Sequence, residues 1–375
     1  MVHTAELTYF PDSNLIEAFN NLPTTQYYRQ EKTYWNGSLK ESHGLTFRIK
    51  KIGHEGFGFV SIRMICRINF KKLISENPKR DAKVDVMTVW DIEDVEKNFN
   101  AAVEEFLPQM PKFEEWKVNR IDYCVNVHTD YVEEYLNLLK KGDRPHLKDW
   151  YDRQGNYSQK PGSLYLVSTA KKKKNRGITV NFYNKYDEII KTIGVSDLEA
   201  EWDVIDEILE LAGDVLRLEI QCHKPKTEHL RKKYGMPNKC VKNYLNPSIA
   251  YELISGYVLR IAGSSEYNRK SITLDMVEQS NFRMDTKKKM SQIIIDVAKQ
   301  HSSIAKVREK YVEEGIMEKA EYNNLIRKMH DKGINPVTIR NNKSLINKKL
   351  KEGLPSLISL FKDAFEDEMA MDIKE

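Results

Sequence analysis

The sequence contains little cysteine and no long apolar run. Its four cysteines lie far apart and form no Cys-x-x-Cys pair, which excludes a zinc ribbon and a disulfide framework and predicts reduced thiols. No stretch approaches the roughly 20 apolar residues that a membrane-spanning helix needs, and the opening segment MVHTAELTYF carries Glu6 and no apolar signal core. We therefore expect a cytoplasmic protein that does not enter a membrane.

Charge is abundant, and its position along the chain is more informative than its sum. Charged residues make up 31% of the chain, yet the formal net charge is only +5. Residues 281–350 contain twice as many Lys and Arg as Asp and Glu, and a KKKKNR run precedes Gly177. Segment 224–242 holds one acid, Glu228, and seven basic residues: Lys224, Lys226, Arg231, Lys232, Lys233, Lys239 and Lys242. Such concentrated positive charge is what a protein that binds a phosphate backbone needs.

The first half of the chain has the pattern of strands interrupted by helices. Helical periodicity covers residues 91–106 and 131–141, each with acids near its start. Strands are predicted where β-branched and aromatic residues are bounded by Gly, Pro or Asn, in HTAELTYF, LTFRIKKI, FGFVSIRMICRINF, KVNRIDYCVNV, SLYLVST, GITVNFYN and VLRLEIQ. The pattern predicts an α+β protein in which an antiparallel sheet carries helices on one face.

After residue 280 only helical periodicity remains, in MSQIIIDVAKQ, IAKVREKYVEEG, EKAEYNNLIRKMHDKG and SLINKKLKEG. Gly315 and Gly333 stand where helix C-caps belong. We therefore expect a catalytic domain over residues 1–280, a basic helical DNA-binding region with helix-turn-helix character over 281–350, and an acidic tail over 351–375.

Three strands have alternating polar and apolar residues, so each has two distinct faces. The apolar residues predict a core face, whereas the opposite face carries single acids and a tyrosine flanked by cations. If the three strands pair in one antiparallel sheet, this polar face collects Arg120, Asp122, Tyr183, Lys185, Arg217 and Glu219, with Glu188 just beyond the strand end. A half-solvated sheet shows the same alternation, so a merely solvated face is the alternative interpretation.

The polar set has the composition of a phosphoryl-transfer site. Converging carboxylates suit Mg²⁺ or Mn²⁺, and adjacent Lys or Arg stabilises charge in the transition state. A tyrosine, whose ordinary pKa is about 10, becomes a useful nucleophile only beside a cation or a metal; Lys185 and the KKKKNR run are candidates for that cation. Tyr165 and Tyr186 are rival nucleophiles, and Asp122 could instead form a structural ion pair with Arg120 or Arg217.

Three blocks of sequence carry a family resemblance: VNRIDYCVNVHTDYVEEYLNLLKKG, ITVNFYNKYDEI and LELAGDVLRLEIQCHKPKTEHLRKKYGMP. With the strand block FVSIRMICRINFKKL ahead of them, they resemble the gene II/X replication initiators of filamentous phages and small plasmids over roughly residues 55–240. The family's Tyr-x-Lys-x-x-Glu pattern falls on Tyr183, Lys185 and Glu188. Its Arg-Ile-Asp and Arg-x-Glu patterns fall on residues 120–122 and 217–219.

The resemblance implies a rolling-circle initiator that nicks and rejoins an origin through a 5′-phosphotyrosyl intermediate. Tyr183 and Lys185 would then be catalytic, with Mg²⁺ or Mn²⁺ as the cofactor. The chain lacks the His-hydrophobic-His motif of better-known relaxases, so carboxylates would have to bind the metal: Asp122, Glu188 and Glu219.

Origin DNA of a plasmid or phage, single-stranded or supercoiled, is the expected partner, in the cytoplasm of a bacterial host and alongside a host helicase. The expected DNA-binding residues are Arg120, Arg217, Lys171, Lys172, Lys173, Lys174, Arg176, Arg231, Lys232 and Lys233. A non-catalytic DNA-binding regulator is the main alternative. An RNA-binding sheet is disfavoured, because such a sheet exposes aromatic residues and not carboxylates.

Overall fold

The computed structural model describes residues 1–22, 25–29, 32–39, 43–52, 61–77, 80–88, 91–144, 146–149, 162–168, 177–192, 202–339 and 353–370. These residues form one large sheet with the order β2-β3-β4-β5-β1-β6-β10-β9-β8-β7, in which neighbouring strands pair antiparallel. The strands are β1 (Val2–Tyr9), β2 (Thr25–Arg29), β3 (Lys32–Leu39), β4 (Leu45–Ile52), β5 (Ser61–Asn69), β6 (Lys117–His128), β7 (Leu147–Asp149), β8 (Ser163–Ser168), β9 (Ile178–Asn184) and β10 (Val215–Cys222).

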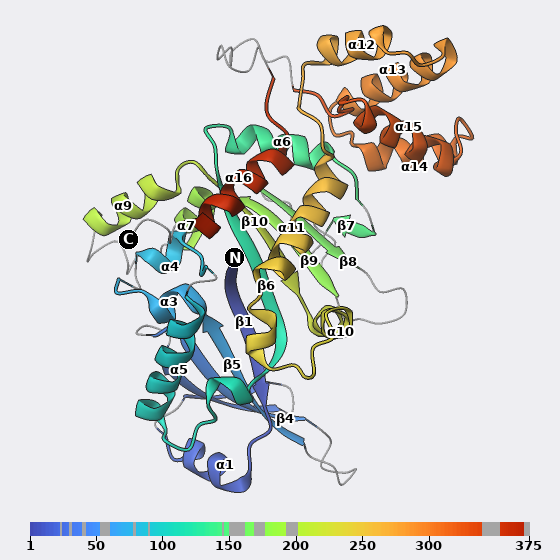
Figure 1. Cartoon of the computed structure of the whole chain (residues 1–375). Coiled ribbons are helices and arrows are strands. Elements are labelled where there is room, and N and C mark those ends of the chain that lie inside the picture. Colours follow the sequence, from blue (N-terminus) through green and yellow to red (C-terminus); the bar gives the residue numbers. More distant parts are fainter. Residues whose placement is uncertain are drawn as a thin grey trace.

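Helices lie on the sheet and form a separate group beyond one end of it (Figure 1). Those of the first half are α1 (Ser13–Asn20), α3 (Phe70–Ile74), α4 (Asp81–Val84), α5 (Ile92–Phe106), the 3₁₀ turn η2 (Phe113–Glu115), α6 (Val132–Lys141), α7 (Lys185–Thr192) and α9 (Trp202–Ala212). They are followed by α10 (Lys224–Lys233), η3 (Val241–Tyr244), α11 (Pro247–Ala262), α12 (Lys270–Gln279), α13 (Met284–Ala298), α14 (Ile304–Glu313), α15 (Lys319–Asp331) and α16 (Leu357–Ala370). No helix in the described ranges is long and apolar enough to cross a bilayer.

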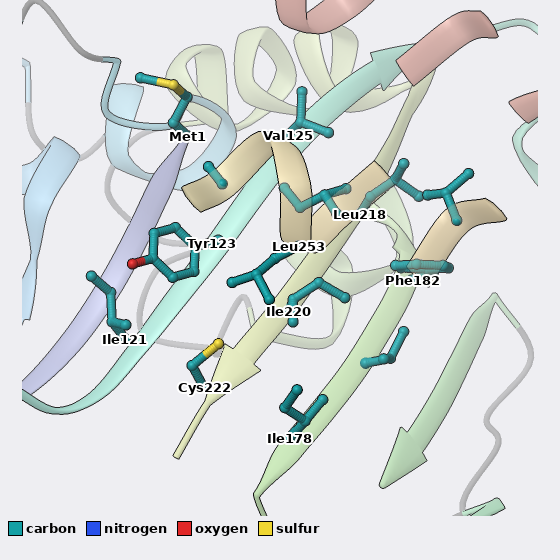
Figure 2. Close-up of a cluster of buried hydrophobic side chains, with 14 of the residues drawn as sticks. Met1, Ile121, Tyr123, Val125, Ile178, Phe182, Leu218, Ile220, Cys222 and Leu253 are labelled. Atoms are coloured by element: carbon teal, nitrogen blue, oxygen red, sulfur yellow. The ribbon is translucent and has the colours of Figure 1, made fainter. Parts of the chain in front are cut away.

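The apolar face of the sheet forms the core. Ile121 and Tyr123 of β6, Phe182 of β9 and Leu218 of β10 are fully buried on it. Leu253 of α11 lies over these side chains (Figure 2). At the other end of the sheet Phe47 of β4 stacks on Phe106 of α5, with ring centroids 5.6 Å apart. One continuous core therefore joins the sheet to the helices on its apolar face.

The predicted α+β class is confirmed, and each predicted strand segment contains an observed strand. Helices α5 and α6 begin within one residue of the predicted ranges. Strands β2, β3 and β7 were missed. β2 and β3 lie in a tyrosine-rich segment without clear alternation, and β7 has only three residues.

Some of the helices after β10 form a unit of their own. Helices α12, α13, α14 and α15 pack against one another in a unit at one end of the molecule (Figure 1). The predicted boundary at residue 280 falls between α12 and α13, which contact each other, so the unit begins before that boundary. Gly315 and Gly333 follow α14 and α15 with φ of +66° and +72°, as expected for C-caps. SLINKKLKEG lies almost wholly outside the described residues.

The segment predicted as an acidic tail is largely a core helix. α16 packs on β6 and α11, with Leu357 and Phe361 fully buried. The Phe361 ring lies 5.5 Å from that of Tyr251 on α11. Asp363, Glu366 and Asp367 lie on the exposed face of this helix, whereas the partly buried Glu368 pairs with the amino terminus at 3.3 Å.

Candidate active site

The polar face predicted from the alternation exists. β10 lies between β6 and β9, so the three strands are neighbours in the sheet. Glu219 pairs with Cys124 on β6 and with Asn181 on β9, and Arg217 pairs with Tyr183. Directly paired residues of antiparallel strands point to the same face, so the register brings the polar residues of all three strands together on the face opposite α11.

Two buried carboxylates occupy the middle of this face. Asp122 is 1% exposed and Glu219 is 4% exposed. Burial and the charge of Glu219 raise the pKa of Asp122 to about 6, against the opposing effects of Arg120 and Thr4. Burial alone would also raise the pKa of Glu219, but hydrogen bonds from His3 and Gln221 and the charge of Arg217 lower it to about 2. The pair therefore shares one site, and Glu219 is the first to ionise.

Residues of β1 form contacts with both carboxylates of the pair. Thr4 donates a hydrogen bond to Asp122 Oδ2, and His3 Nδ1 lies 3.4 Å from Glu219 Oε2. The pairing of β1 with β6 shifts in register between Val2 and Thr4, which places His3 beside the site. Sequence reasoning missed this contact, because His3 is far from the polar strands along the chain. Gln221, which donates to Glu219 Oε1 at 2.7 Å, could have been found from the alternation of β10.

Tyr183 lies on the predicted face, in a buried position. It is 6% exposed, and its hydroxyl donates to Glu219 Oε2 at 3.4 Å. Burial and the neighbouring charge of Glu219 raise the pKa of its phenol well above the ordinary value, whereas the charge of Arg217 lowers it. Arg217, which was not among the candidates Lys185 and the KKKKNR run, is therefore a cation that favours the phenolate.

Lys185 and Glu188 belong to the first turn of α7, since the helix begins at Lys185 directly after β9. Lys185 is 4% exposed, and its Nζ lies 6.0 Å from the centroid of the Tyr183 ring. Burial and the charge of Arg217 lower the pKa of Lys185 to about 8, against the effect of Glu188. The Glu188 carboxylate accepts a 2.7 Å hydrogen bond from Lys185, so it is engaged with the ammonium group.

The two predicted arginines differ in exposure. Arg120 is partly exposed and forms a bidentate ion pair with Asp122, with hydrogen bonds of 2.8 Å and 2.7 Å. The ion pair considered as an alternative role for Asp122 is therefore present. Arg217 is fully buried, donates to Asn126 and to the carbonyl of Val84, and leaves its Nη1 without a hydrogen-bond partner in the described part of the chain. Its burial leaves no surface for a DNA strand.

The other predicted DNA-binding residues lie elsewhere. The loop with Lys171, Lys172, Lys173, Lys174 and Arg176 falls outside the described residues. Arg231, Lys232 and Lys233 lie on α10, whose buried Leu230 packs into the core beneath the apolar face. Arg231 pairs with Glu228, and Lys233 pairs with Glu252. The fold therefore does not bring the α10 cations to Tyr183.

The rival tyrosines are placed differently from each other. Tyr165 of β8 pairs with Asn181 of β9, so it shares the polar face but is two strands away from Glu219. Tyr186 is 39% exposed on α7. Tyr183 lies on the strand next to Glu219 and donates a hydrogen bond to that carboxylate, which favours it over both rivals.

The candidate site offers a hard cation such as Mg²⁺ a pair of carboxylates and not a complete set of protein ligands. Within the described ranges, no three His, Cys, Asp or Glu side chains are arranged to hold a metal ion. Asp122 and Glu219 nevertheless form a pair of buried oxygen donors. Mg²⁺ is usually held by one or two carboxylates together with water and substrate phosphates, and not by a full protein cage. The pair therefore suits an ion whose other ligands are water and, when DNA is bound, a substrate phosphate.

Comparison with known proteins identifies the family. No curated protein and no solved structure matches the chain. The Phage_CRI family model, which describes the N-terminal region of a gene II-type replication-associated protein, matches residues 47–245, more than half of the chain. The match includes β6, β9 and β10 with Asp122, Tyr183 and Glu219, whereas His3 and Thr4 lie outside it. The chain belongs to this family of phage replication-associated proteins, and its membership supports a role as a rolling-circle replication initiator.

Proposed function

We propose that the protein nicks and rejoins replication-origin DNA by transesterification, with Tyr183 as the nucleophile. The observation that carries the proposal is the pairing of Tyr183 with Arg217 on one side and with the carboxylate of Glu219 on the other. An initiator of this class needs a residue that can store the energy of a cleaved phosphodiester as a covalent bond, and a tyrosine ester does so. Membership in a family of replication-associated proteins supports DNA as the substrate.

The chemistry assigns a task to each neighbour. The Tyr183 oxygen attacks a backbone phosphorus, so that a Tyr–O–P bond to the 5′-phosphate forms as the P–O3′ bond breaks. The departing 3′-oxygen takes a proton from water and leaves as a 3′-hydroxyl. Glu219, already the acceptor of the phenol hydrogen bond, accepts the phenol proton as the new bond forms. The unpaired Nη1 of Arg217 donates to the developing phenolate, and the Lys185 ammonium adds positive charge near the ring. Reversal of these steps rejoins the strand.

Asp122 and Glu219 would hold Mg²⁺ or Mn²⁺. When bound, the ion would polarise a phosphoryl oxygen and offset the negative charge of the two carboxylates. Glu188 would join them only after releasing Lys185, so we assign it the secondary role of holding the ammonium in place. A host helicase remains the proposed partner for strand separation.

A nicking assay tests the proposal. Wild-type protein with supercoiled origin DNA and Mn²⁺ or Mg²⁺ should give nicked circles, and Tyr183→Phe should give none. Tyr165→Phe is the matched control and should nick like the wild type. If Tyr183→Phe nicks at the wild-type rate, another residue is the nucleophile.

A non-catalytic DNA-binding protein is the second candidate, favoured by the burial of Tyr183 and its raised pKa. That role predicts origin binding without nicked product under any metal condition. It also predicts equal origin affinity for Tyr183→Phe and wild type.

A further inference from the structure

The polar face of the sheet continues past the candidate site onto β1, β5 and β4. Glu6 of β1 pairs with Arg120 of β6 on one side and with Arg67 of β5 on the other, and Arg67 pairs with Thr46 of β4. Lys50 of β4 pairs with Arg63 of β5. By the antiparallel register these residues share the face that carries Asp122, opposite the face on which Phe47 contacts α5.

This extension of the face is strongly basic. β1, β4 and β5 together contain one acid, Glu6. Glu6 lies between two guanidinium groups, 3.7 Å from Arg48 and 3.5 Å from Arg67. Arg67 remains 59% exposed. The cations Arg48, Lys50, Arg63, Arg67 and Arg120 therefore form a band, here called the arginine band, that leads away from Asp122.

An exposed aromatic residue lies beside the band. Phe10 follows β1 and is 53% exposed. The guanidinium of Arg63 lies 5.1 Å from the centroid of its ring. The Nε of Arg63 is buried and has no hydrogen-bond partner in the described ranges. A run of cations next to an exposed aromatic side chain supplies the two contacts, to phosphates and to a base, by which proteins hold single-stranded nucleic acid without reading its sequence.

The geometry of the candidate site favours one strand over a duplex. Tyr183 and Asp122 are almost fully buried, and the Val84 carbonyl covers the Arg217 end of the site. Arg120, the neighbour of Asp122, is partly exposed, so the side of Arg120 offers an approach for the scissile phosphate across the sheet. From β9 to β4 there are five strand spacings, or roughly 24 Å at about 4.8 Å each. That length spans about seven phosphates at a B-form spacing and fewer in an extended strand.

We propose that the arginine band holds the single-stranded DNA that flanks the scissile phosphate, with one base stacked on Phe10. This inference rests on the proposed function, because it takes the scissile phosphate to lie at Tyr183. It adds a substrate-binding surface whose cations lie mainly on β4 and β5, away from the basic segments recognised in the sequence.

The test measures binding without chemistry. A dye-labelled oligothymidylate is titrated with the full-length protein over a series of NaCl concentrations, and affinity is read from fluorescence anisotropy. The salt slope is the slope of the logarithm of the binding constant against the logarithm of the NaCl concentration. Each lost phosphate contact lowers its magnitude by about 0.7 for a single strand. Lys50→Gln combined with Arg67→Gln should therefore lower it by roughly 1.4. Phe10→Ala should weaken binding roughly 5- to 150-fold, the loss of one stacked base, with the slope unchanged.

Matched controls lie on helices that cover the opposite face. Lys97 on α5 and Arg260 on α11 are exposed cations, and Lys97→Gln combined with Arg260→Gln should leave slope and affinity unchanged. Circular dichroism melting should show all variants folded. If the Lys50 and Arg67 double variant behaves like this control, the band does not hold DNA.

The outcome is separable from that of the nicking assay. If the protein binds oligothymidylate through the band but never nicks DNA, the assignment of Tyr183 as nucleophile is wrong and the binding surface stands. If the protein nicks DNA through Tyr183 but the double variant has an unchanged salt slope, the nucleophile stands and the proposed binding surface is wrong.

Discussion

Two carboxylates on one sheet face ionise very differently because their partners differ. Glu219 accepts hydrogen bonds from His3, Gln221 and Tyr183. Asp122 has Thr4 and Arg120 as partners but also experiences the charge of Glu219. A pKa of about 6 for Asp122 means that its charge is destabilising near neutral pH until a cation compensates it. A buried charge that a bound ion would compensate is typical of a functional site.

Asp122→Asn should show this destabilisation as a pH-dependent difference in stability. The folded-state pKa of Asp122 lies above its ordinary value of 3.8, so the native state holds the proton more tightly and loses stability as pH rises from about 4 to 6. Denaturant unfolding should show Asp122→Asn gaining on the order of 2 kcal/mol relative to wild type between about pH 4 and pH 7. Glu104→Gln, at an exposed site on α5, is the control. Parallel pH profiles for Asp122→Asn and wild type would contradict the assignment.

Mg²⁺ should stabilise the wild type at neutral pH, because an ion that binds only the folded state raises the free energy of unfolding. The Asp122→Asn protein should lose most of that increase. Thermal melting with and without Mg²⁺ measures the effect with no DNA present. Equal stabilisation of both proteins would place the ion elsewhere.

At the scale of elements, helix α16 ties the end of the described chain to the centre of the sheet. Its residues Leu357 and Phe361 are fully buried, and the Phe365 ring lies 5.2 Å from that of Tyr251. The acids Glu366, Asp367 and Glu368 obscured this role in the sequence, because net charge was more evident than the spacing of the apolar residues.

Phe361→Ala should destabilise the protein by about 3–5 kcal/mol, the usual cost of emptying a buried aromatic site. Lys362→Ala, its exposed neighbour, should change stability by less than about 0.5 kcal/mol. Urea unfolding compares the two. A small effect of Phe361→Ala would mean that α16 is a dispensable tail.

At the scale of the whole molecule, cations lie on both sides of the sheet, and we expect the two sets to contact different parts of the DNA. Lys232 lies on α10, on the side of the apolar face, whereas Arg120 lies on the polar face. We expect α10 and the α12–α15 unit to contact flanking duplex at the origin. Phosphate contacts there would set affinity without taking part in chemistry.

Lys232→Gln should therefore weaken binding of origin duplex and reduce its salt slope by about 0.9, the value for one phosphate of B-form DNA. The nicking rate on saturating single-stranded origin oligonucleotide should not change. Exposed Lys97 on α5 supplies the control substitution. A lower nicking rate at saturation would instead place Lys232 close to the site.

Much of the fold could be predicted from the sequence, because two-residue alternation gives both the strands and their faces. The convergence of Asp122, Tyr183 and Glu219 followed from that alternation once the strands were taken as neighbours. His3 could not be predicted, because it reaches the site through a register shift between β1 and β6. The burial of Arg217 could not be predicted either, since it depends on the Val84 carbonyl after β5, far away in the sequence.

The most direct measurement is the identity of the residue linked to DNA. Wild-type protein is incubated with a single-stranded origin oligonucleotide and Mn²⁺, the covalent adduct is digested with trypsin and nuclease, and the modified peptide is sequenced by mass spectrometry. We expect a phosphonucleotide on Tyr183 in the peptide that spans β9. A modification on Tyr165 or Tyr186, or no adduct under conditions where nicked product forms, would contradict it.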